Sequence, residues 1–200
     1  MIYGDSLVIL SYHVQEIDTF MNPESKARGR YYTYGVEPSC VFDGGSPVMV
    51  QNPDSFYARY QDQILGARSQ VTSLTMEFDT AITKIEASQL NIGLNVTPTE
   101  SLPDPANLRL FVAVYEKVAP YLSSFPPFDT LHTWFVVRRI LPDTSGLNLT
   151  VDFPFSFDTT FTSTIENWDK TQIGVAAFVQ NIETKKVLQA VVKRNFPEVK

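Results

Sequence analysis

The sequence predicts a mainly β protein of the α+β class, with a small α/β unit at residues 1–67 and a β-sandwich at residues 68–200. Two observations support this division. Before Gly66, strand-like and helix-like segments alternate, whereas after it nearly every segment alternates apolar and polar residues with period two. The chain has 200 residues and is 44% apolar, which is enough for a sizeable core without disulfides.

The first unit has the predicted order strand, helix, strand, strand, helix. Residues 7–10 form a short apolar run that is typical of a buried central strand. Asn22 before Pro23 is a good helix start, and the helix is expected over residues 23–32, with Gly35 after it. Strands at residues 39–42 and 47–50 flank an Asp-Gly turn, and a last helix runs from Pro53 to Gly66 with an apolar stripe: Phe56, Tyr60, Ile64 and Leu65.

The second unit consists of strands with one apolar and one polar face. The alternating runs lie at residues 74–79, 89–96, 108–114 and 147–153. Residues 173–180 and 187–192 are apolar on both faces, joined by a hairpin connection, and are expected at the centre of a sheet. Seven or eight such strands predict an immunoglobulin-like β-sandwich.

Residues 36–44, Val-Glu-Pro-Ser-Cys-Val-Phe-Asp-Gly, resemble the part of a thioredoxin fold that faces its redox site. In that fold a cis proline precedes the third strand, which makes Pro38 the cis-proline candidate; a cis bond before proline costs only about 0.5–1 kcal/mol. The alternative is that Pro38 only shapes a turn. Cys40 is the one cysteine, and we expect a small buried hydrophobic residue because no basic neighbour would activate its thiol.

Five segments together resemble the Omp28-related family of exported bacterial proteins. They read SYHVQEIDTF (11–20), PESKARGRYYTYGVEPSCVFDG (23–44), LRLFVAVYEKVAPY (108–121), TWFVVRRILPDTSG (133–146) and GVAAFVQNIETKKVLQAV (174–191). The resemblance implies a thioredoxin-like segment, a C-terminal β domain and a place in the cell envelope or outside the cell. This chain departs from the pattern because it lacks the strand and helix that carry Cys-x-x-C, and dithiol exchange needs two thiols.

Residue chemistry predicts no catalytic set, cofactor or metal site. His13 and His132 are far apart in sequence, and His13 is expected to be a hydrogen-bonded residue at a strand end. A Ser-His-Asp set is not apparent, and a cation held between Asp18 and Asp43 is a weak alternative. One arginine of the Arg138-Arg139 doublet is expected to pair with a carboxylate across the sheet.

Two triplets fit the N-glycosylation pattern, at Asn95 and Asn148, on the polar sides of predicted strands. Chance is the better explanation for both.

The net charge of −6 argues against a nucleic-acid partner, which needs a basic surface. No apolar run reaches the ~20 residues of a membrane helix, and residues 1–5 do not resemble a signal peptide.

We therefore expect a non-catalytic, extracellular or envelope protein with a structural or interaction role, which assembles with itself. A half-complete thioredoxin-like sheet would expose an edge, and strand addition from another subunit would cover it. The candidate donors are residues 1–6 and 195–200, and head-to-tail donation would give filaments.

Two alternatives remain open. One is a thiol-disulfide oxidoreductase-like protein whose Cys-x-x-C segment is missing from this chain. The other is a monomeric adhesion or carbohydrate-binding module, which would need a surface row of aromatic residues; the candidates are Phe111, Tyr115, Trp134 and Trp168.

Overall fold

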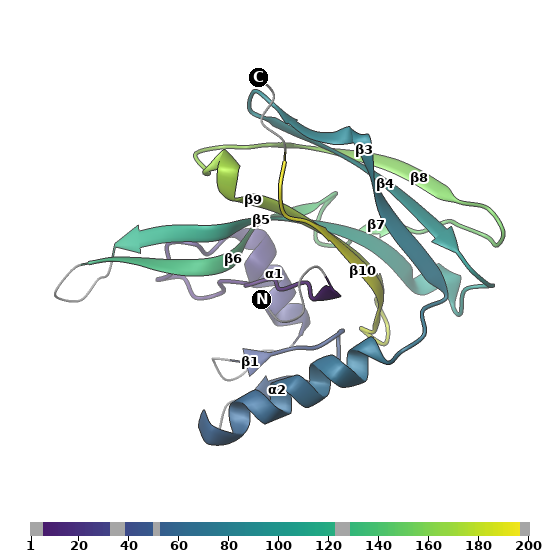
Figure 1. The fold of residues 1–200 in the computed structure, drawn as a ribbon, viewed down its shortest axis with the longest axis horizontal. Helices are drawn as coiled ribbons and strands as arrows, with labels where there is room; N and C mark the ends of the chain where they lie inside the picture. Colours follow the sequence, from purple (N-terminus) through teal and green to yellow (C-terminus); the bar gives the residue numbers. More distant parts are fainter. Residues whose placement is uncertain (1–5, 33–38, 50–52, 123–128, 197–200) are drawn as a thin grey trace.

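The structure is a computed structural model that describes residues 6–32, 39–49, 53–122 and 129–196 (Figure 1). Its helices are α1 (Pro23–Tyr31) and α2 (Pro53–Arg68), with short 3-10 helices η2 (Pro105–Asn107) and η3 (Lys170–Gln172). Its strands are β1 (Ser39–Cys40), β2 (Val48–Met49), β3 (Leu74–Glu86), β4 (Gln89–Pro98), β5 (Leu108–Leu122), β6 (Thr130–Leu141), β7 (Leu147–Asn148), β8 (Phe157–Thr164), β9 (Ile173–Asn181) and β10 (Val187–Lys193). The protein is mainly β. No helix in the described ranges is long and apolar enough to cross a membrane.

Two antiparallel sheets face each other and enclose the main core. The larger has the order β10-β9-β5-β6, with β7 also paired to β5, and the smaller has the order β3-β4-β8. Alternate residues of β4 and β5 point between the sheets, among them Leu90, Ile92, Leu110 and Val112, each fully buried. The period-two pattern of the sequence therefore places these apolar side chains in the core.

The second face of the larger sheet is buried as well, which corrects the expectation that residues 108–114 leave one face in water. Phe111, Ala113 and Tyr115 of β5 belong to a second core on that face. The chain segment before α1 covers it, with Val8 and Leu10 packed against these residues. β5 is thus covered on one side by the smaller sheet and on the other by the N-terminal segment.

Residues 7–10 do not form the predicted central strand. They are extended but join no sheet, and Ile9 is 38% exposed. Only Ser11 forms a bridge, parallel to Val136 of β6. The apolar run packs its side chains onto the face of a sheet instead of pairing its backbone within one.

The helix and hairpin predictions in the first unit are confirmed, with shorter strands. Asn22 caps α1, since its side-chain oxygen accepts a hydrogen bond from the Ser25 N–H at 2.7 Å. β1 and β2 pair around a turn in which Asp43 and Gly44 have φ values of +44° and +78°.

The end of the second predicted helix differs from expectation. Gly66 lies inside α2, which continues to Arg68, and Leu65 of the predicted apolar stripe is half exposed. The stripe is therefore not buried along its full length.

The predicted strand at residues 147–153 is reduced to β7. Leu149 and Val151 are still buried in the main core. β7 belongs to the larger sheet and β8 to the smaller one, so the residues between them cross from one sheet to the other and cannot continue a single ladder.

Candidate functional site

Of the two residues expected near a thioredoxin-like site, Pro38 lies outside the described residues. Cys40 is half-buried rather than buried, and it pairs with Val48 across the β1–β2 hairpin. Its side chain contacts Tyr60 of α2, and burial together with the hydrogen bond to Cys40 raises the pKa of the Tyr60 hydroxyl. Cys40 thus joins the hairpin to α2, and its role as a thiol stays a prediction.

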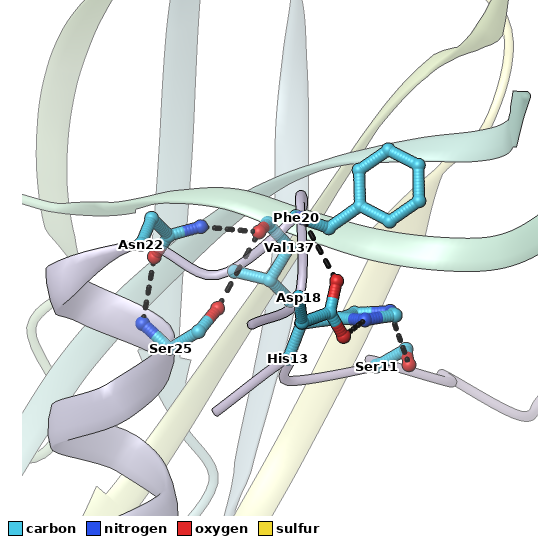
Figure 2. A network of polar contacts seen from close by, with 7 residues as sticks. All are labelled: Ser11, His13, Asp18, Phe20, Asn22, Ser25 and Val137. Carbon is cyan, nitrogen blue, oxygen red and sulfur yellow. Dashed lines mark hydrogen bonds and ion pairs between the residues drawn. The ribbon is translucent and has the colours of Figure 1, made fainter. Parts of the chain in front are cut away.

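The structure brings together a Ser-His-Asp set that the sequence interpretation missed (Figure 2). The His13 Nδ1 atom lies 2.6 Å from a carboxylate oxygen of Asp18, and its Nε2 atom lies 3.3 Å from the Ser11 hydroxyl. The second carboxylate oxygen of Asp18 accepts a hydrogen bond from the Phe20 N–H at 2.9 Å. The signal was present in the sequence, because the three residues lie within one short segment.

Backbone bonds of Ser11, beside this set, fasten the N-terminal segment to β6. Ser11 donates its backbone N–H to the Phe135 carbonyl at 2.8 Å and accepts from the Val137 N–H at 3.0 Å. The Val137 carbonyl in turn accepts a hydrogen bond from the Asn22 side chain at 2.8 Å (Figure 2). The Ser11 backbone and the Asn22 side chain thus form an anchor that holds the N-terminal segment to β6.

The anchor covers the outer edge of β6 only from Phe135 onward. Towards its beginning, β6 pairs with β5 alone: Thr130 is opposite Leu122, and Trp134 is opposite Val118. Among the described residues, no backbone group bonds to the outer edge of residues 130–134. This stretch is therefore an open sheet edge, the kind of feature to which another strand adds.

The open edge lies on an arm that extends past the sandwich. β9 pairs with β5 only as far as Glu116, so the later residues of β5 and the first residues of β6 form a two-stranded ribbon. We call residues 118–122 and 130–134 the β5–β6 arm; it projects at the left of Figure 1. At the base of the arm, buried Glu116 accepts a hydrogen bond from Arg138 at 2.6 Å, as expected for that doublet.

The arm carries exposed apolar side chains and no charged residue. Leu122 is 67% exposed, Leu131 42% and Trp134 58%. The other edge of the arm contains Pro120, which has no N–H to offer a further strand. One edge of the arm, that of β6, is thus chemically suited to accept a strand.

Other sheet edges in the described ranges are protected or polar. On β10, Val187 donates to the Asp43 carbonyl at 2.9 Å, and Ala190 donates to the Gln189 side chain at 3.0 Å. β3 is interrupted by an irregularity at which the Asp79 carboxylate binds backbone N–H groups. β8 is open, but its exposed residues are polar and include Asp158.

The row of aromatic residues that a carbohydrate module would need is not formed. Phe111 and Tyr115 are buried in the second core, and Trp168 is partly buried against the main one. Trp134 is exposed without a second aromatic residue of that row beside it on the surface. This alternative therefore loses its structural basis.

The remaining polar candidates are placed as follows. Asn148 is exposed, and the Asn95 amide donates a hydrogen bond to Asp158 at 2.8 Å; glycosylation of either stays a prediction. Within the described ranges, no three His, Cys, Asp or Glu side chains are placed to hold a metal ion. Burial raises the pKa of the Asp43 carboxyl.

Comparisons with known proteins give a likeness of fold. No family model and no curated protein matches the chain. HBP35 of Porphyromonas gingivalis has a similar structure, with a TM-score of 0.64, 14% identity, and coverage of 88% of this chain and 59% of that one. A domain of the outer membrane lipoprotein Omp28 from the same organism has a TM-score of 0.42, 16% identity, and coverage of 64% and 93%. This chain thus shares its fold with somewhat over half of the HBP35 chain.

Proposed function

We propose that this chain belongs to an exported, envelope-associated protein that acts through non-catalytic protein–protein interaction, and that it joins its partner by β-strand addition at the β5–β6 arm. The observation that carries this proposal is the open edge of β6 at residues 130–134, which is largely exposed, carries no Lys, Arg, Asp or Glu, and presents the apolar side chains of Leu131 and Trp134. The envelope location rests on the sequence resemblance to the Omp28-related family.

The physical basis of this proposal is that an unpaired sheet edge beside exposed apolar side chains is unfavourable when it is left in water. Backbone N–H and C=O groups in an open edge form a ready template for another strand, and natural proteins usually block it with lysine, proline or a bulge. The edge of β3 is interrupted by an irregularity, and two backbone N–H groups of β10 are bonded, one to the Gln189 side chain and one to the β1–β2 hairpin. Residues 130–134 contain no lysine, proline or irregularity, and none of their outer backbone groups is bonded to another described residue. An edge without protection is consistent with a surface that a partner covers.

Two finer points of architecture belong to the same proposal. Residues 1–67 would be a partial thioredoxin-like unit, with Pro38 at its cis-proline position, and residues 68–200 an immunoglobulin-like sandwich. The order helix, β-hairpin, helix around Cys40 (α1, β1, β2, α2) and the two facing sheets support this assignment.

Site-specific photo-cross-linking in the cells that make the protein tests the proposed surface. A benzophenone side chain placed at His132 probes the open edge, and the same group at Thr160 probes the polar edge of β8 as a matched control. We expect an adduct from position 132 that disappears when Thr133→Pro is added, and none from position 160. Equal adducts from both positions, or none from position 132, would refute strand addition at the arm.

A further inference from the structure

We infer that the strand added at the arm comes from a second copy of this chain, so that two β6 strands pair antiparallel across a two-fold axis at His132. This inference rests on the proposed function and names its partner. It replaces head-to-tail donation from residues 1–6 or 195–200, most of which lie outside the described residues.

The ends of the open edge fix the register. The anchor formed by Ser11 occupies β6 at Phe135 and Val137, so a second strand cannot extend beyond Trp134 without displacing it. At the other end, β6 begins at Thr130. His132 is the midpoint of the stretch that remains, and an antiparallel pair of identical strands that uses all of it must place His132 opposite its own copy.

The stretch is chemically complementary to itself in this register. Thr130 would lie opposite the partner copy's position 134, a β-branched residue beside an aromatic one, which is a favourable cross-strand pair. Leu131 would lie opposite Thr133, an aliphatic residue beside a β-branched one. Neither contact places like charges together, because residues 130–134 contain no Lys, Arg, Asp or Glu.

Two-fold pairing also explains why the arm extends past the sandwich. The ribbon beyond Glu116 lacks the support of β9, so the open edge stands clear of the rest of the larger sheet. The exposed Trp134 side chain lies on the stretch of β6 that would pair. An interface that uses one patch on both subunits closes on itself, and the expected product is a dimer and not a filament.

The interface is small, so the dimer is expected to be weak. A short ladder with a few apolar side chains falls well under the 1,200–2,000 Å² that specific, stable interfaces typically bury. We therefore expect association over roughly the micromolar range, detectable by sedimentation of concentrated protein.

Sedimentation velocity of the purified full chain tests the inference. We expect the wild-type species to shift from 22.6 kDa to about twice that mass as the concentration rises. His132→Lys alone and His132→Glu alone should each weaken self-association by about tenfold or more, because like charges then face each other across the axis. An equimolar mixture of the two variants should restore the dimer, because Lys then faces Glu.

The control pair is Thr160→Lys and Thr160→Glu on the open edge of β8, which should leave self-association unchanged. Far-UV circular dichroism of every variant confirms that it is folded. A wild-type chain that stays at 22.6 kDa throughout would overturn the inference. A dimer that survives both His132 variants, or a mixture that restores nothing, would overturn the register.

The outcomes separate this inference from the proposed function. If position 132 cross-links in cells to a different protein while the purified chain remains monomeric, strand addition at the arm stands and the second copy is excluded. If position 132 forms no adduct, the proposed function itself fails.

Discussion

Arg28 is the buried cation that holds α1 against the larger sheet. Its side chain is 2% exposed, and its guanidinium donates hydrogen bonds from Nη2 to the Tyr32 hydroxyl at 2.6 Å and to the Gln180 side-chain oxygen at 2.8 Å. The rings of Phe111 and Tyr31 lie 4.7 and 4.9 Å from its Cζ atom. No carboxylate pairs with Arg28 among the described residues, so hydrogen bonds and aromatic faces stabilise the charge.

Two substitutions separate the charge from the packing. Arg28→Met removes the charge and keeps most of the volume. The buried Gln180 oxygen then lacks this donor, which costs about 1–3 kcal/mol. In the other direction, the desolvation penalty of a buried cation disappears. Arg28→Lys keeps the buried cation but loses the planar guanidinium, which lies over the aromatic rings while its Nη2 atom donates to both acceptors. We expect a loss of about 1–2 kcal/mol in the free energy of unfolding for Met and about 3–5 kcal/mol for Lys.

Urea unfolding followed by circular dichroism measures both values, with Arg59→Met and Arg59→Lys on the exposed side of α2 as the control pair. The decisive observation is the stability of Arg28→Lys relative to the wild type. If Arg28→Lys is as stable as the wild type within about 0.5 kcal/mol, the guanidinium is not held as described and the reasoning about α1 is wrong.

Three further predictions concern the β1–β2 hairpin and the Ser11-His13-Asp18 set. Gly44→Ala should lower the free energy of unfolding by about 3 kcal/mol or more, because φ is +78° and the new Cβ would lie 1.6 Å from a carbonyl oxygen in the β9–β10 turn. The control, Gly66→Ala, lies in open space within α2 and should be neutral or slightly stabilising. Equal effects of the two substitutions in urea unfolding would contradict the close approach at Gly44. Asp18→Ala should lower the free energy of unfolding by about 1–2 kcal/mol and Ser11→Ala by less than about 0.5 kcal/mol, because the hydrogen bond from Asp18 to His13 is short and that from Ser11 is long. A larger loss of stability for Ser11→Ala in thermal unfolding would contradict this ranking. Burial raises the pKa of Asp43 in the folded state, so its ionisation destabilises the protein as pH rises. Asp43→Asn should therefore raise the free energy of unfolding at pH 7 and raise it less at pH 3. A stabilisation that grows toward low pH would show that the pKa of Asp43 is lowered in the folded state.

Local elements could be predicted from the sequence because their signals are local. Asn22 before Pro23 marks the start of α1, and the Asp43-Gly44 pair marks the hairpin turn. Alternation in residues 74–79 and 89–96 placed their apolar side chains in the core. The signal for burial of both faces of β5 was also present, since Phe111 and Tyr115 alternate with the leucines that face the main core.

What the sequence could not specify depends on contacts between distant segments. Residues 7–10 have the composition of a central strand, and only the neighbours they meet decide that they lie across the face of a sheet instead. The open edge of β6 is another such feature. It exists because β6 is the last strand of the larger sheet and because Ser11 reaches no further than Phe135, and neither limit is written in residues 130–134 themselves.

Hydrogen–deuterium exchange of the backbone amides at residues 130–134, compared between dilute and concentrated protein, tests the central claim most directly. The account predicts that these amides exchange more slowly in the concentrated sample, while the amides of β8, the other open edge, do not change. Exchange at residues 130–134 that is independent of concentration, with slowing elsewhere on the surface, would contradict it.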